Sequence, residues 1–469
     1  MALSKRDSPD IPQPGFTINK ILLITFCAVW IRNLLFWFFK DAFGTSLNYW
    51  AFTDWLIDYS QGFIRRGLSG EIWRLFPSGM SRLEMVAIFS WVLILAVVLG
   101  YVRLLVRSYK NIHPLTLFGL LFMPSLFFFY LHDHNAIGRK ETLGYVVMLI
   151  HLLVIEKSFP LGDLLTPVGG KLRHYIYRLL PVTVLFLPVT ILIHEGNFLL
   201  FVPLHAMITL TFMRMESQSG FLRAASLTGL LYLPAAVTFG AVYLTGTPAY
   251  QALLGICNNW LAVGAVREGA CVLPPEGLSG STLPAALIPM QWSLAKAVSI
   301  TRMVISRNWQ AWLITLPVLG AMLWYLVRQV VYAVLRFNIK QGFSSQTTIR
   351  YTGLFFRKYF LVPVLFSLPI YFTAYDYGRW FTIACVNFSI LAVSANLPCR
   401  EFAHHNKGAD DADAADDPPG HADHWLIFYG VSALICILAL IIWLPHYCLF
   451  NCEIIHSPLE FLSFMYDVR

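Results

Sequence analysis

Long apolar stretches recur along almost the whole chain and most constrain its fold. A membrane-spanning α-helix needs about 20 mainly apolar residues. Only 13% of the 469 residues are charged, about half the usual share in soluble proteins. The sequence therefore predicts an all-α, polytopic integral membrane protein and excludes a soluble enzyme, a disordered protein and a protein with a single anchor. Eleven stretches are predicted as transmembrane helices: Ile21–Phe39, Leu83–Leu105, His113–Leu131, Thr142–Ile155, Leu179–Ile193, Asn197–Phe212, Ala224–Leu244, Ala311–Val334, Phe360–Ala374, Trp380–Ala395 and Trp425–Trp443.

The distribution of Lys and Arg predicts the orientation. With the N-terminus inside, more of these residues fall in inside segments than in outside segments, as expected for cytoplasmic loops. The net charge of +8 is thereby explained by loop residues, and we expect no nucleic-acid partner. The predicted organisation is a cytoplasmic tail (1–20), a multi-span domain (21–396) with outer loops at 40–82 and 245–310, a cytoplasmic acidic linker (397–424), and a last span with an outer tail (425–469).

The first outer loop contains acidic and basic residues among many aromatic residues. Asp54 and Asp58 are four residues apart, so a helix lying along the membrane surface would place both on one face. Arg65 and Arg66 precede Gly67, a pattern that suits a phosphate, because guanidinium groups bind its oxygens in pairs and Gly allows close approach. The alternative is that the acids simply neutralise the arginines.

A second polar cluster follows the third predicted span. His132, Asp133 and His134 could ligate a divalent cation such as Mg²⁺ or Mn²⁺, or transfer protons. An ordinary polar loop is the alternative, since adjacent residues do not share a helical face. Arg139 and Lys140 lie where the fourth span begins, and helix N-termini favour anions.

Two further clusters lie at predicted outer boundaries between spans. His194 and Glu195 join two apolar stretches with almost no loop, which favours either a catalytic pair or a hydrogen-bonded turn. Asp376 and Arg379 lie beside Tyr and Trp. They are either a local ion pair at the membrane interface or part of a surface that binds sugars.

The fourth outer loop, 245–310, contains Cys257 and Cys271. Both are predicted on the outer side, and a disulfide between them is expected if that compartment is oxidising. The stretch Ala295–Ser306 is predicted as a basic amphipathic segment at the interface.

Together, these clusters suit glycosyl transfer from a polyprenyl-phosphate sugar. Cations hold the lipid phosphate and stabilise the leaving group, and a carboxylate deprotonates or orients the acceptor. We expect Arg65, Arg66, Arg139 and Lys140 to bind phosphate and Asp54 or Asp58 to act as the base. His194, Glu195, Asp376 and Arg379 would complete the site. The expected partners are a polyprenyl-linked glycan donor, a glycan or lipid-linked acceptor, and membrane lipids.

The layout resembles the GT-C superfamily of polytopic glycosyltransferases. Those enzymes have a first span, a long outer loop with an acidic residue and interfacial helices, and a second acidic site after the third span. The resemblance implies that Asp54 or Asp58 matches the first acid and Asp133 the second. His132-Asp133-His134 departs from the family's usual acidic pair. The layout is also similar to O-antigen polymerases, which use outer-face arginines, and it implies a bacterial inner membrane with a periplasmic active face.

Two other functions compete with this one. A transporter or flippase for an anionic or lipid-linked substrate would need charges along a path through the membrane, whereas the charges here are predicted at one face. A non-catalytic scaffold of an envelope complex would use the outer loops as contact surfaces.

Overall fold

The computed structural model describes residues 14–43, 49–76, 81–122, 126–127, 138–158, 169–217, 220–266, 269–271, 283–306, 361–373 and 377–395, with isolated positions between 309 and 326. Every regular element in these ranges is helical. Four stretches of helix are long and apolar enough to cross a membrane: Arg82–Ser108, Leu172–Ile193, Gly196–Met213 and Phe221–Thr245.

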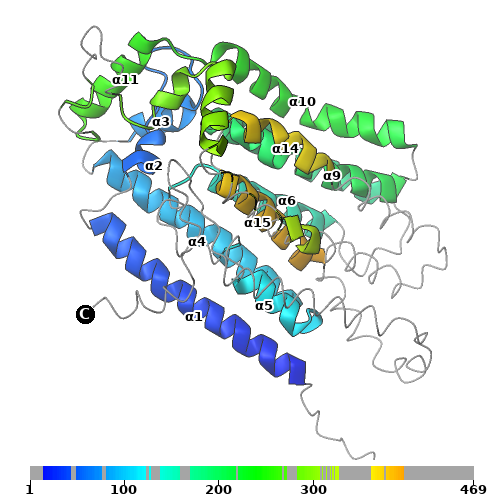
Figure 1. The fold of residues 1–469 in the computed structure, drawn as a ribbon. Helices are drawn as coiled ribbons and strands as arrows, with labels where there is room; N and C mark the ends of the chain where they lie inside the picture. The colour runs from blue at the N-terminus through cyan, green and yellow to red at the C-terminus, as the bar shows by residue number, and fades with distance from the viewer. Residues whose placement is uncertain are drawn as a thin grey trace, which may run out of the picture.

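The long helices lie side by side (Figure 1). Helix α4 (Arg82–Ser108) packs against α1 (Pro14–Phe43), α6 (Thr142–Ser158) and α15 (Tyr377–Ala395). Helix α9 (Gly196–Ser217) packs against α6 and α15, and also against two further helices. These are α10 (Phe221–Thr245) and α14 (Leu361–Thr373). The short α5 (Pro114–Phe122) follows the turn η1 (Tyr109–Asn111) and packs against α1.

The described helices refine the predicted spans. Helix α1 begins at Pro14, ahead of Ile21, and Pro suits a first helical turn because its missing N–H needs no partner there. The predicted span Leu179–Ile193 is the second half of a longer helix formed by α7 (Gly169–Leu180), the π-helical η5 (Pro181–Phe186) and α8 (Leu187–Ile193). The linker 397–424, the segment 425–469 and most of Ala311–Val334 fall outside the described part of the chain.

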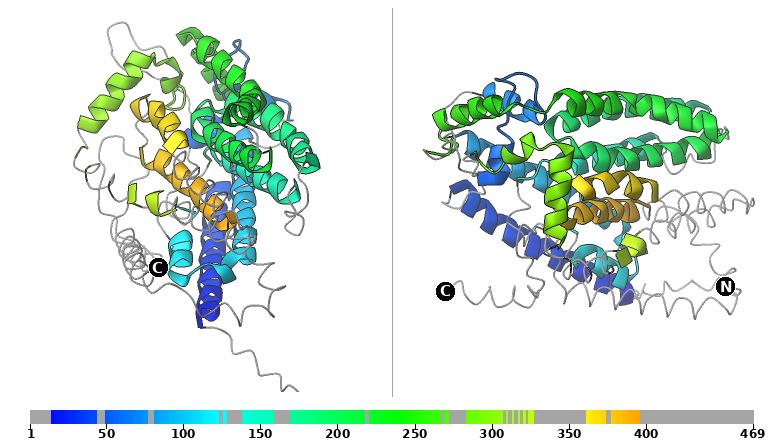
Figure 2. Two further views of the ribbon diagram at one scale, coloured as in Figure 1. Left: turned by 90° about the vertical axis from the view of Figure 1, so that its right-hand side faces the viewer. Right: turned by 45° about the horizontal axis from the view of Figure 1, so that its top comes forward.

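The two predicted outer loops form helices at one end of the bundle. Helices α2 (Tyr49–Asp54), α3 (Gly67–Arg74) and α11 (Tyr250–Ala262) gather there (Figure 1). A further helix over residues 294–306, yellow-green in Figure 2, runs across the direction of α9 and α10. The turn η6 (Ile288–Gln291) precedes it. The amphipathic stretch predicted at Ala295–Ser306 therefore forms a helix, whereas α11 has no counterpart among the predicted elements.

Close backbone contacts fix this end. The N–H of Gly70 donates to the carbonyl oxygen of Ile57 at 3.0 Å, and a Cβ at residue 70 would lie 2.2 Å from that oxygen. Only glycine fits there. The indole N–H of Trp260 donates to the Leu56 carbonyl at 2.9 Å, which attaches α11 to the segment that follows α2.

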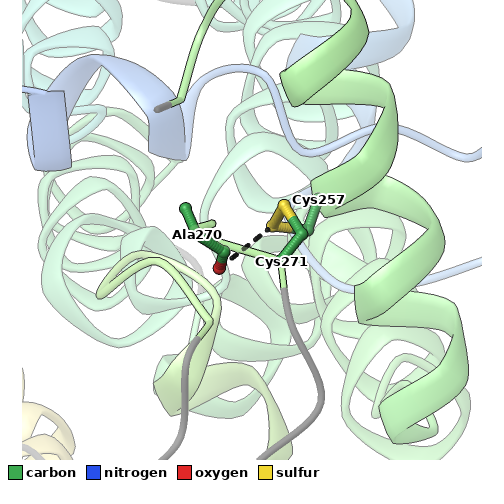
Figure 3. Close-up of a disulfide and its surroundings, with 3 residues drawn as sticks. All are labelled: Cys257, Ala270 and Cys271. Carbon is green, nitrogen blue, oxygen red and sulfur yellow. Dashed lines mark hydrogen bonds between the residues drawn. A yellow bond between two sulfur atoms is a disulfide. The ribbon is translucent and has the colours of Figure 1, made fainter. Parts of the chain in front are cut away.

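Cys257 of α11 forms a disulfide with Cys271, with a Cα–Cα distance of 5.7 Å (Figure 3). The Cys257 sulfur lies 3.7 Å from the carbonyl oxygen of Ala270. The disulfide therefore lies in the loop that extends from α10 over this end of the bundle, at the cysteine pair that the sequence predicts.

Candidate functional site

A cavity of about 410 Å³ lies where α2, α3 and the 294–306 helix meet the ends of α6, α9, α10, α14 and α15. Eight residues that the sequence singles out line it, although they come from four segments of the chain: Asp54, Arg65, Arg66, Arg139, Lys140, His194, Glu195 and Arg379.

Arg66 occupies the centre of the first charge cluster. Its backbone is left-handed, with φ 65°, and among the described residues it is the only one other than glycine with positive φ. Such a conformation costs about 1–2 kcal/mol and is typical of functional positions. It places the Arg66 guanidinium against Glu195, to which Nε and Nη2 each donate at 2.9 Å. The Nη1 atom lies 3.5 Å from Oδ1 of Asp54.

Lys140 and Asp54 extend this cluster. The Lys140 ammonium is 1% exposed and lies 3.4 Å from Oδ2 of Asp54. Burial lowers the pKa of Lys140 to about 8, although Asp54 opposes the shift. Burial alone would raise the pKa of Asp54, but Lys140 and Arg66 hold it below its ordinary value. Arg65 contributes a further cation, and its Nη2 donates to the Pro289 carbonyl at 2.6 Å.

A second cluster forms around Glu141, which is not among the predicted site residues. Its Oε1 atom lies 3.1 Å from Nη2 of Arg379 and 3.5 Å from Nε2 of His194. The side chain is 2% exposed, and neither carboxylate oxygen makes a hydrogen bond with the described residues. Burial alone would raise the pKa of Glu141, but Arg379, His194 and Arg139 lower it to about 2. Glu141 is thus a buried, ionised carboxylate held between Arg379 and His194 at the wall of the cavity.

The tautomer of His194 follows from its contacts. The N–H of Gly196 donates to Nδ1 of His194 at 3.1 Å, so the proton of the neutral ring lies on Nε2, toward Glu141. Burial and Arg66 lower the pKa of His194 to about 4, so the ring is neutral at pH 7. The guanidinium of Arg379 stacks on the Trp380 ring at 4.1 Å, which orients it within the cavity.

The charged lining has an excess of positive charge. Five cations, Arg65, Arg66, Arg139, Lys140 and Arg379, face three carboxylates, Asp54, Glu141 and Glu195. Because His194 is neutral, two positive charges of the described lining are not balanced by carboxylates. A cavity with this balance favours an anion carrying one or two negative charges.

The remaining lining is largely apolar. Side chains from α9, α10, α14 and the 294–306 helix form it: Leu199, Phe239, Val242, Tyr243, Leu294, Ala297 and Ile370. Tyr243 and Leu294 are each more than half exposed at the surface of the bundle. The cavity therefore joins a charged wall to an apolar wall that reaches the molecule's surface.

Asp58 does not join the site. Helix α2 ends at Asp54, so the shared helical face predicted for Asp54 and Asp58 is wrong. Asp58 is buried outside the lining, and its Oδ1 accepts the N–H of Ser60 at 3.0 Å. The Asp58 carboxylate thus caps the backbone of the segment that follows α2, after the helix has ended at Asp54.

Four other candidates, His132, Asp133, His134 and Asp376, fall at positions whose structure is not described. Within the described ranges, no group of three or more His, Cys, Asp or Glu side chains is placed to hold a metal ion. The predicted roles of these four residues therefore stay predictions.

Comparison with known proteins adds the class of the chain. Residues 21–132 are similar to a family described as uncharacterised membrane protein Rv1490. No curated protein and no solved structure matches the chain. With the apolar helices, this similarity supports an integral membrane protein, and the part of it that the structure describes is helical.

Proposed function

We propose that this chain is a membrane glycosyltransferase or glycan polymerase that uses a polyprenyl-phosphate-linked sugar donor at the non-cytoplasmic face. The observation that carries the proposal is a single cavity with an excess of cations, ionised carboxylates and an apolar wall. A lipid-linked donor needs all three, because its phosphate, its reacting sugar and its lipid chain differ in chemistry.

Arg65, Arg66, Arg139 and Lys140 bind the lipid phosphate in this proposal. The described ion pairs then exchange partners, because a phosphate that draws Arg66 and Lys140 toward itself releases Asp54 from both cations. The pKa of Asp54 rises toward its ordinary value, and its carboxylate becomes a better base for the acceptor hydroxyl. Phosphate binding and base activation are thus linked through the same two side chains.

Glu141, His194, Glu195 and Arg379 position the sugar. Arg379 and His194 hold the carboxylate of Glu141 in place at the wall of the cavity. Trp380 lines the same cavity and holds the guanidinium of Arg379 against its ring. If the reaction uses Mg²⁺ or Mn²⁺, His132, Asp133 and His134 remain the proposed ligands.

The apolar wall accommodates the lipid chain. Phe239 and Tyr243 of α10 face the cavity together with Leu294 and Ala297 of the 294–306 helix. Because Tyr243 and Leu294 are exposed at the surface of the bundle, a polyprenyl chain held here extends into the surrounding lipid.

The disulfide supports the assignment of the face. Cys257 lies on α11, whose Trp260 contacts the loop that carries Arg65 and Arg66. Disulfides persist in oxidising compartments, so this end of the bundle is proposed to face the periplasm of a bacterial inner membrane, with the N-terminus in the cytoplasm. The proposed pathway is synthesis of a surface polysaccharide such as O-antigen.

The test replaces the native protein with Arg66→Gln, Asp54→Asn or Glu141→Gln in living cells, each at normal membrane abundance. We expect one surface glycan to be lost or shortened and its lipid-linked precursor to accumulate. Arg74→Gln is the matched control, because Arg74 lies at the far end of α3 in an exposed pair with Glu71. An unchanged glycan profile in all three variants would contradict the proposal and favour a scaffold.

A further inference from the structure

A chain of five polar side chains lies buried in the helical bundle, apart from the cavity. His151 of α6 and His205 of α9 face each other, with their Nδ1 atoms 2.8 Å apart. The chain continues from Nε2 of His151 to the hydroxyl of Tyr175 at 2.9 Å, then to Thr209 at 3.2 Å and to Tyr232 at 2.9 Å. These residues lie on α6, α7, α9 and α10.

The chain is separate from the proposed transferase site. His205 follows Gly196 by nine residues on α9. It therefore lies about 13 Å further along the helix than the cavity lining. The buried rings of Tyr145 and Phe201 pack against each other between these two levels, at a centroid distance of 5.5 Å. None of the five residues lines the cavity.

The contacts allow two arrangements of the protons. In the first, His151 donates from Nδ1 to His205, and the hydroxyls of Tyr232, Thr209 and Tyr175 each donate toward His151. In the second, every donor and acceptor is reversed, and His205 donates from Nδ1 to His151. Both arrangements contain four hydrogen bonds, so the geometry does not select one of them.

A purely structural role explains these features poorly. Polar groups in membrane helices contribute only about 0.6 kcal/mol per hydrogen bond, and ionisable residues there are usually functional. Nε2 of His205 is buried and makes no hydrogen bond within the described ranges, which a structural network would avoid. The adjoining π-helical η5 packs against α6 and α10, and π-helical turns are frequent at functional sites.

We propose that these five hydrogen-bonded side chains form an intramembrane proton-transfer site. Starting from the first arrangement, His205 releases the proton on Nε2 and receives one on Nδ1 from His151. His151 receives a proton on Nε2 from Tyr175, which takes one from Thr209, and Thr209 takes one from Tyr232. Tyr232 then accepts a proton from a water molecule, and a second water molecule takes the proton that Nε2 of His205 releases, so one proton enters at Tyr232 and one leaves at His205. The same transfers in the reverse direction restore the first arrangement.

The test is NMR of the full-length protein in lipid nanodiscs with ¹⁵N-labelled histidine. Resonances are assigned from their loss in His151→Gln and His205→Gln. We expect the two facing Nδ1 nitrogens to have chemical shifts between the protonated and unprotonated limits, because one proton exchanges between them. Thr209→Val removes the hydroxyl and interrupts the chain, while the side chain keeps nearly the same shape. In this variant, the chemical shift of one Nδ1 nitrogen should move toward the protonated limit and that of the other toward the unprotonated limit.

Two further variants keep the test decisive. Thr211→Val is the matched control, because Thr211 lies on the same helix and its hydroxyl donates to the Met207 carbonyl of that helix. Its shifts should equal those of the wild type. Tyr232→Phe replaces Thr209→Val if the latter does not fold, and it should produce the same movement. The proposal would be overturned if the two Nδ1 nitrogens of the wild type had the chemical shifts of a fully protonated and a fully unprotonated nitrogen. It would also be overturned if neither Thr209→Val nor Tyr232→Phe changed these shifts.

Discussion

The guanidinium of Arg66 donates through both Nε and Nη2 to the carboxylate of Glu195, although 129 residues separate the two in sequence. This pair joins the loop between α2 and α3 to the short turn between α8 and α9. Each of the two side chains is 20% exposed, and both line the cavity. The pair is therefore both a link between two parts of the fold and an accessible part of the site.

Arg66→Gln should destabilise the protein and abolish transfer. Because a largely buried carboxylate loses its main partner, we expect the free energy of unfolding to fall by about 3 kcal/mol. The double variant Arg66→Met with Glu195→Leu should recover most of this stability, measured by thermal unfolding in detergent, but no glycan synthesis. Recovery of glycan synthesis in the double variant would show that the pair is only structural.

Asp54→Asn and Asp58→Asn should differ sharply, although both residues lie in the same loop. Asp54 lines the cavity between Arg66 and Lys140, whereas Asp58 caps the backbone at Ser60. We expect Asp54→Asn to lower the rate of transfer at least 100-fold. Asp58→Asn should keep near-normal activity, since an amide oxygen can still accept the Ser60 N–H. Equal losses in matched membrane preparations would contradict the assignment.

The sequence was sufficient to predict the membrane class and most residues of the charged cavity. Apolar length predicts spans, and polar residues at boundaries are expensive unless they are used, so Arg66, His194 and Arg379 were recognisable from sequence. Helix periodicity failed at Asp58, because α2 ends at Asp54 and Asp58 lies in the segment that follows, where it accepts the Ser60 N–H.

Residues that depend on tertiary contacts were not recognisable. Glu141 resembled an ordinary helix-start carboxylate until the fold placed it against Arg379 and His194. The pair His151 and His205 lies inside apolar stretches 54 residues apart, and only helix packing brings the two rings together. A signal was present in each case, namely an ionisable residue at or within a predicted span, but its partner could not be identified without the fold.

His194 should make the protein sensitive to acid. Its pKa is about 4 in the folded protein, below the ordinary value of 6.5, so the folded state favours the neutral ring. The corresponding stability is fully present above pH 6.5 and is lost as the pH falls toward 4, because the unfolded chain binds a proton that the folded chain does not. Thermal unfolding midpoints measured from pH 7 to pH 4.5 should therefore fall less in His194→Gln than in the wild type.

The exposed His174 provides the matched control for this titration. His174→Gln should follow the wild-type pH dependence. Parallel curves for His194→Gln and the wild type would contradict the assignment of a neutral, buried His194.

The disulfide should report which side of the membrane the cavity faces. Mild reduction of intact cells should increase labelling by a membrane-impermeant thiol reagent, because it frees Cys257 and Cys271, and a Cys257→Ser/Cys271→Ser variant should lose this increase. The same double variant should lower the free energy of unfolding by about 3 kcal/mol, as expected for a loop of this length. Labelling that requires permeabilised cells would place this end of the bundle in the cytoplasm.

The most direct measurement uses purified protein in lipid nanodiscs and the lipid fraction of cells that lack it. The account predicts that the wild type consumes a polyprenyl-phosphate-linked glycan in this fraction and releases the free lipid phosphate. Arg66→Gln should fail to do so, and the surface control Arg74→Gln should match the wild type. If no lipid-linked glycan is consumed by a folded wild-type protein, or if Arg66→Gln consumes it equally well, the cavity is not the site of glycosyl transfer.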